Sequence, residues 1–198
     1  MSVEGILKNE LSRAGLVFSE DIQHKLSLYV QELLHWNKKI NLTSLEGTQL
    51  VRRLIVEPAW IGHELQMSAS LADIGSGNGS PGIPLCVTRN ISIAHLIEAR
   101  TKRAAFLRHV ATRLELHGIT VHRSRVEDID EKSLDVQWIT LQAVSPTPEL
   151  MKALQRLFPA TTRVVWITSN SSSPASQAKH ISVPGSNSEA WIIQLDQF

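Results

Sequence analysis

The stretch LADIGSGNGSPGIPL, residues 71–85, decides the fold of this chain. An apolar run ends at Asp73 and leads into a segment with four glycines in eight residues. A strand that passes through a glycine loop into a helix presents free backbone N–H groups at the carboxyl edge of a sheet, where open α/β folds bind ligands. The stretch therefore predicts the first turn of an α/β sheet and a ligand site within it.

Strand-like and helix-like segments alternate after this loop. The predicted strands are residues 71–74, 94–97, 119–122, 136–141, 163–168 and 190–195, and the predicted helices include 102–116 and 148–157. Such alternation is typical of a parallel sheet with helices on both faces. Residues 181–195 break the pattern, because a Pro-Gly-Ser-Asn turn joins two short strands, and they predict an antiparallel hairpin. The Ser-rich residues 169–178 are interpreted as a mobile surface loop.

The residues before the loop predict a separate helical part. Ser19 is expected to cap a helix that ends near Asn37 and carries apolar residues at helical spacing. A shorter helix over 3–14 precedes it, and a third over 49–63 is expected to be interrupted at Pro58. We therefore expect a helical subdomain over 1–65 and an α/β domain over 66–198.

Composition narrows the class of protein. A chain of 198 residues with a net charge of +1 gives no global signal for nucleic acid, so any basic surface must arise from uneven distribution. The single cysteine, Cys86, excludes an intrachain disulfide framework and fits a reducing compartment. The chain lacks an apolar run of membrane-spanning length and a signal-peptide pattern at its start. We expect a cytoplasmic monomer that makes no contact with a membrane.

The glycine spacing leaves more than one nucleotide ligand open. The dinucleotide pattern G-x-G-x-x-G fits at Gly77, Gly79 and Gly82, which keeps a nicotinamide oxidoreductase as a hypothesis. Pro81 lies inside this match and Pro84 follows it, and each removes an N–H that a pyrophosphate would need. The spacing therefore disfavours a pyrophosphate ligand.

Acidic residues after the next two strands indicate a nucleoside. Glu98 ends the second predicted strand, about 20 residues after the loop, where an acid can accept hydrogen bonds from ribose hydroxyls. Val126 and Glu127, followed by Asp128, come after the third strand, where a backbone amide and an acid could bind an adenine edge. Ribose and adenine without pyrophosphate describe S-adenosylmethionine. Asp73 would then either hold the loop or meet the amino group of the cofactor.

Four segments of the chain resemble the glucose-inhibited division protein B family. They are LLHWNKKINLTSL (33–45), the glycine loop, EARTKRAAFLRHV (98–110) and SRVED (124–128). The resemblance implies a Rossmann-like class I methyltransferase sheet and methyl transfer from S-adenosylmethionine to N7 of a guanine in 16S ribosomal RNA of the small subunit. It also implies that the cofactor is bound by Gly75, Ser80, Val126, Glu127 and Gln142. These residues join the cofactor-binding candidates Asp73, Gly77 and Glu98, which the residue pattern itself indicates.

Three positions depart from what the family usually carries. Gln142 stands where the family has arginine, Ser80 replaces a bulky apolar residue, and RVVWITSNSSS (163–173) lacks the family's glycine and lysine. Glutamine keeps hydrogen bonding but loses the fixed charge and the fork of a guanidinium. A second hypothesis is therefore a degenerate member that binds cofactor or RNA without transferring methyl.

The expected chemistry needs few catalytic groups. Guanine N7 already carries an in-plane lone pair, so the reaction is a displacement that depends on positioning, and no catalytic residue is assigned. The eight histidines show no triad or metal spacing, so no metal is expected. Between residues 100 and 125, seven Arg or Lys face one acid, Glu115, which favours an RNA surface. The RNA-binding candidates are Lys38, Lys39, Arg52, Arg53, Arg100, Lys102, Arg103, Arg108, Arg123 and Arg125.

Overall fold

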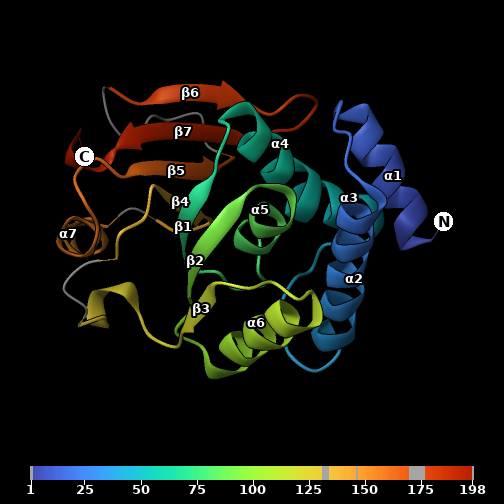
Figure 1. Ribbon diagram of the computed structural model, residues 1–198, viewed down its shortest axis with the longest axis horizontal. Coiled ribbons are helices and arrows are strands. Elements are labelled where there is room, and N and C mark those ends of the chain that lie inside the picture. Colours follow the sequence, from blue (N-terminus) through green and yellow to red (C-terminus); the bar gives the residue numbers. More distant parts are fainter. Residues whose placement is uncertain (1, 131–133, 146, 170–176, 198) are drawn as a thin grey trace.

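A seven-stranded sheet forms the centre of the computed structural model, which describes residues 2–130, 134–145, 147–169 and 177–197 (Figure 1). The strands are β1 (Ala69–Ile74), β2 (Ile91–Ile97), β3 (Ile119–His122), β4 (Trp138–Gln142), β5 (Arg163–Thr168), β6 (Lys179–Ser182) and β7 (Glu189–Gln194). Their order is β3-β2-β1-β4-β5-β7-β6. The first five strands in this order pair in parallel, and β7 runs antiparallel to both β5 and β6. The predicted α/β class and the antiparallel C-terminal hairpin are confirmed.

Helices cover both faces of this sheet. They are α1 (Val3–Arg13), α2 (Glu20–Asn37), α3 (Gly47–Val51), α4 (Glu57–Glu64), α5 (Gly82–Thr88), α6 (Thr101–Arg113) and α7 (Pro148–Leu157), with short 3-10 turns at Val126–Asp128 and Leu195–Gln197. Figure 1 shows α7 to the left of the central strands and α5 to their right. One face therefore carries α7, and the N-terminal helices join α5 and α6 on the other.

The N-terminal helices share a core with the sheet domain. Leu26 and Tyr29 of α2 are fully buried in the same apolar cluster as Ile83 of α5, Leu96 of β2 and Phe106 of α6. Burial of such side chains is worth roughly 1.5–3 kcal/mol each, so this contact holds α2 firmly against the loop that follows β1. The division at residue 65 stays a prediction, and the packing places the helical part directly beside the ligand edge of the sheet.

The helix that contains Pro58 differs from the prediction. Instead of an interruption, α3, a π-helical segment (Arg52–Val56) and α4 run on continuously from residue 47 to 64. The N–H of Glu57 bonds to the carbonyl of Arg52, five residues back. This wider turn lies directly before Pro58 and accommodates a residue that has no N–H and a bulky ring. The proline therefore changes the helix type without ending the helix.

Two further sequence predictions concern the Ser-rich loop and the absence of a membrane-spanning helix. Residues 170–176, the main part of the Ser-rich segment, lie outside the described residues. Within the described ranges, no helix has the length and apolar character that a membrane span requires.

Candidate cofactor and substrate site

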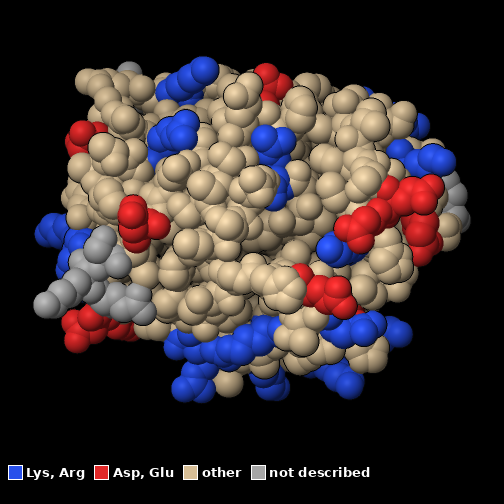
Figure 2. All heavy atoms as spheres, viewed as in Figure 1, with Lys and Arg blue, Asp and Glu red and all other residues tan. Residues whose placement is uncertain are grey.

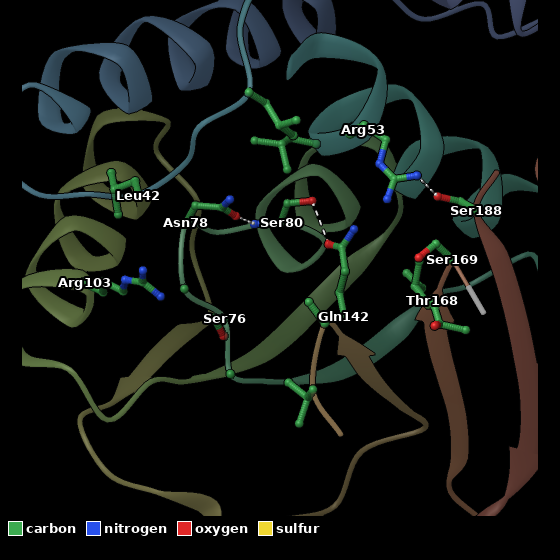
Figure 3. A pocket seen from close by; sticks show the side chains of 17 residues that line it. Leu42, Arg53, Ser76, Asn78, Ser80, Arg103, Gln142, Thr168, Ser169 and Ser188 are labelled. Carbon is green, nitrogen blue, oxygen red and sulfur yellow. Dashed lines mark hydrogen bonds between the residues drawn. The ribbon is translucent and has the colours of Figure 1, made fainter. Parts of the chain in front are cut away.

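A cavity of about 370 Å³, called the main cavity below, lies at the carboxyl ends of β1, β4 and β5 (Figure 3). Its lining comes from the glycine loop, from the ends of β4 and β5, and from the N-terminal helical part. The lining residues are Leu42, Leu45, Arg53, Leu54, Gly75, Ser76, Gly77, Asn78, Ser80, Arg103, Gln142, Ala143, Val144, Ile167, Thr168, Ser169 and Ser188. The cavity therefore lies where an open α/β sheet binds its ligand.

A second cavity of about 330 Å³, called the side cavity, adjoins the first. The two share Gly75 and Val144 in their linings. The side cavity is also lined by Ile74, Ile97, Glu98, Ala99, Ser124, Arg125, Val126, Glu127, Ser145, Thr147 and Leu150. A long ligand can thus extend from one cavity into the other over the first glycine of the loop.

The glycine loop is held from both sides. The N–H groups of Gly75 and Ser76 both donate to the carbonyl of Ile97, at 2.9 and 3.0 Å. From the helical part, the Tyr29 hydroxyl donates to the carbonyl of Asn78 at 2.8 Å. Gly75 has φ +74°, and a Cβ on it would lie 3.0 Å from Val144, so only glycine suits the point where the cavities meet.

Glu98 connects the loop to the side cavity. Its Oε2 accepts the N–H of Gly77 at 2.9 Å, and its Oε1 accepts the N–H of Arg100 at 2.7 Å. The side chain is almost buried yet contributes to the lining of the side cavity. A carboxylate has about four acceptor positions, so two bonds to the backbone leave capacity for hydroxyl groups of a ligand.

Asp73 lines neither cavity. It is 1% exposed and lies behind the loop, where its Oδ1 accepts from the Thr140 hydroxyl at 2.7 Å. Burial raises the pKa of Asp73 to about 6, an effect that the hydrogen bond from Thr140 partly offsets. Of its two predicted roles, this position favours holding the loop over contact with a ligand.

Gln142 and Ser80 lie side by side in the lining of the main cavity. The Ser80 hydroxyl donates to Oε1 of Gln142 at 3.1 Å, as Figure 3 shows. Two of the three positions at which the resemblance implied other residues are therefore partners in one hydrogen bond. Together they give this part of the cavity wall a neutral polar pair.

Residues 38–45 form a wall beside the main cavity, and the sequence pattern predicted an RNA contact for Lys38 and Lys39 but no cavity role for Leu42 and Leu45. Asn37 shapes it: its Oδ1 accepts the N–H groups of Leu42 and Thr43 at 2.8 and 3.0 Å, and its Nδ2 donates to the Thr43 carbonyl at 2.9 Å. The wall brings Leu42 and Leu45 to the main cavity. The available signal was the segment LLHWNKKINLTSL, whose asparagine follows a helical run and precedes a turn.

The predicted basic residues separate into groups. Arg53 and Arg103 line the main cavity, and Arg125 lines the side cavity. Basic side chains gather along the lower edge of the molecule in Figure 2, where Figure 1 shows α6. The remaining candidates lie just after α2 (Lys38, Lys39), just after β3 (Arg123), at the start of and along α6 (Arg100, Lys102, Arg108), and beside the β6–β7 turn (Arg52).

Solved structures place this architecture in a class. The fold is similar to that of an MtNAS variant in complex with S-adenosylmethionine, with a TM-score of 0.57, 14% identity, and coverage of 97% of this chain and 87% of that one. It is also similar to an rRNA methylase from Streptococcus thermophilus, with a TM-score of 0.50, 12% identity, and coverage of 69% and 95%. The chain therefore has the fold of the class I S-adenosylmethionine-dependent methyltransferases.

Sequence comparison then gives the family. The profile of the family described as rRNA small subunit methyltransferase G (GidB) matches residues 22–187, and the chain belongs to that family. A relative named Ribosomal RNA small subunit methyltransferase G from Wolinella succinogenes is 31% identical over 160 residues, which are 81% of this chain and 82% of the relative. The protein of the same name from Pectobacterium atrosepticum is 41% identical over 128 residues, 62% of this chain and 59% of its own length. This second match spans less than two thirds of the relative.

Proposed function

We propose that the protein is an S-adenosylmethionine-dependent methyltransferase that acts on N7 of a guanine in small-subunit ribosomal RNA. The observation that carries this proposal is the pair of joined cavities that share Gly75 at the carboxyl end of β1. Membership of the GidB family supports the RNA as substrate.

The residues present fit the cofactor. Glu98 would accept the ribose hydroxyls, and Val126 and Glu127 would line the adenine in the side cavity. Gly75 and Gly77 would border the amino-acid end in the main cavity, beside Ser80 and Gln142. S-adenosylmethionine would supply a methyl group bound to a sulfonium sulfur. When the methyl group is transferred, the electron pair of the broken C–S bond stays on sulfur.

The demands on the protein's own groups are modest. The lone pair of guanine N7 forms the new bond to the methyl carbon, so no proton has to be removed from the nucleophile. The main cavity has only to hold the base in line with the methyl group and to exclude water, and good positioning alone can lower the barrier by several kcal/mol. Leu42, Leu45 and Leu54 give that cavity an apolar side on which a base can rest.

The decisive experiment is transfer of labelled methyl to small-subunit ribosomal RNA. It compares naked RNA with the assembled subunit, and the wild-type protein with Gln142→Arg. We expect transfer by the wild type, because the Ser80–Gln142 pair keeps the cavity lined with polar groups. An inert wild type whose activity is restored by Gln142→Arg would instead establish a degenerate binding module.

Calorimetry tests the cofactor separately. We expect S-adenosylhomocysteine to bind and NAD not to, since Pro81 and Pro84 remove N–H groups that a pyrophosphate requires. Binding of NAD alone would favour a nicotinamide oxidoreductase and contradict the proposal.

A further inference from the structure

Arg53 stands where the main cavity opens into a neighbouring groove. That groove, called the turn groove, has a volume of about 390 Å³ and runs between the helix of residues 47–64 and the β6–β7 turn. Leu45 and Arg53 belong to the linings of both hollows, and Gln49 and Asn187 lie farther along the turn groove. An extended ligand with its end in the main cavity would pass Arg53 on leaving it.

The guanidinium of Arg53 is held by a chain of hydrogen bonds with one direction. Nη1 donates to the Ser188 hydroxyl at 2.6 Å, and that hydroxyl donates to Oε2 of Glu57 at 2.5 Å. A guanidinium only donates and a carboxylate only accepts, so the Ser188 hydroxyl accepts from Arg53 and donates its own proton to Glu57. Figure 3 shows Arg53 pointing to Ser188 at the cavity wall.

The anchor itself is buried and fixed. Glu57 is 1% exposed and accepts a second bond from the Ser186 hydroxyl at 2.6 Å. On the other side of the turn, Arg52 donates to the carbonyls of Pro184, at 3.2 Å, and Gly185. The β6–β7 turn is thus clamped to the helix, and the orientation of Arg53 follows from that clamp.

Most donors of Arg53 are left for a ligand. Its side chain is 36% exposed, and among the described residues its only hydrogen bond goes from Nη1 to Ser188, while the same Nη1 forms an ion pair with Oε2 of Glu57 at 3.6 Å. A guanidinium has five N–H groups in a planar fork that matches a phosphate. The arginine therefore presents an oriented set of donors to the cavity mouth.

The second cation of the main cavity lies elsewhere. Nη2 of Arg103 donates to the Asn41 carbonyl at 3.0 Å, and a Cβ built on Gly77 would lie 3.6 Å from its Nη1. Arg103 is thus against the glycine loop, and Figure 3 shows it on the opposite side of the cavity from Arg53. The two cations border different parts of the site.

We propose that Arg53 binds a phosphate of the RNA strand next to the target nucleotide, where the strand passes from the main cavity into the turn groove. Ser188 and Glu57 are its positioning residues. A phosphate is favoured over the guanine edge, because an arginine bound to O6 and N7 would occupy the lone pair that must receive the methyl group. This inference rests on the proposed function for the identity of the RNA.

The test measures binding of fluorescently labelled small-subunit ribosomal RNA over a range of salt concentrations, without requiring activity. For Arg53→Gln we expect about tenfold weaker binding and a salt slope smaller by about one, the signature of one lost phosphate contact. Arg53→Lys should keep the slope and bind at intermediate strength, since an ammonium is a point charge without the fork. Affinity for S-adenosylhomocysteine should not change in either variant.

Two further variants separate charge from position. Ser188→Ala leaves the cation but removes its hydrogen bond to the turn, so that only the ion pair of Nη1 with Oε2 of Glu57, at 3.6 Å, still orients it, and we expect weaker RNA binding with an unchanged salt slope. The matched control is Arg13→Gln, which removes an exposed arginine of α1 that pairs with Glu10 and should leave RNA binding as in the wild type. Thermal unfolding of each variant checks that it is folded.

Wild-type affinity and salt slope in Arg53→Gln and Arg53→Lys would overturn the inference. So would loss of S-adenosylhomocysteine binding in Arg53→Gln with RNA binding intact, because Arg53 would then serve the cofactor. A wild type that binds RNA through Arg53 but transfers no methyl would contradict the proposed function and support this inference. The two can therefore fail independently.

Discussion

The backbone N–H of Gly77 donates to Oε2 of Glu98 at 2.9 Å, which joins the glycine loop to the end of β2 through a carboxylate that lines the side cavity. The other oxygen of Glu98 is fixed by the N–H of Arg100 at 2.7 Å. Both oxygens are therefore oriented before any ligand arrives. A preoriented acceptor binds hydroxyl groups with little further loss of entropy.

Replacing this carboxylate should weaken the cofactor site. In Glu98→Gln one oxygen becomes an NH₂ group, which cannot accept from the backbone or from a ribose hydroxyl. Hydrogen bonds to charged groups contribute about 1.5–3 kcal/mol, so affinity for S-adenosylhomocysteine should fall at least about tenfold in calorimetry. Glu115→Gln, an exposed acid outside both cavities, is the control. Equal affinities in the two variants would rule out the ribose contact.

Gly82 should tolerate no side chain. A Cβ there would lie 2.7 Å from Leu96 and 2.8 Å from Oδ2 of Asp73, because α5 packs directly on the sheet. Overpacking of this kind costs about 1–3 kcal/mol, so Gly82→Ala should lower the free energy of unfolding by that amount in denaturant titrations. Gly5→Ala in α1, where a Cβ would meet only Ser2 Oγ at 3.5 Å, should instead raise it by about 0.5–1 kcal/mol. Similar effects of both substitutions would contradict the packing argument.

The hydrogen bond between Ser80 and Gln142 can be measured by a double-mutant cycle. Its length of 3.1 Å and the near burial of Ser80 predict a coupling energy of about 1 kcal/mol between Ser80→Ala and Gln142→Ala. The free energy of unfolding of the four proteins gives this value. Strictly additive effects would mean that the two side chains do not interact.

Local pattern predicted the sheet well. The bounds of β3, β5 and α7 agree with the predicted segments, because alternating or helical apolar spacing and the proline at the start of α7 act over short distances. The helix through Pro58 was harder, since a π-helical turn depends on how the whole segment packs. The expectation that Pro58 disturbs the helix was correct, but the expected interruption of the helix was wrong.

The candidate site likewise has features that the local sequence pattern predicts and features that depend on tertiary packing. The order of strands in a βαβ unit was enough to predict that Glu98 lies at the ligand edge beside the glycine loop, and its bond from the N–H of Gly77 agrees with that position. The anchoring of Arg53 by Ser188 joins residues 135 positions apart, and no local pattern relates them. Asp73 shows the remaining difficulty, because a strand-terminal acid can face a ligand or the core, and only the packing of Thr140 beside it decides.

Burial of Asp73 makes stability depend on pH in an uncommon direction. Its pKa rises from an ordinary 3.8 to about 6, so between these values the folded state holds more protons than the unfolded state. The free energy of unfolding should therefore fall as pH rises from about 4 to 6, by roughly 3 kcal/mol for the full shift. Asp73→Asn keeps an acceptor for Thr140 but does not titrate. Denaturant titrations of both proteins at several pH values isolate the effect, and a pH-independent difference between them would show that the Asp73 carboxyl is not perturbed.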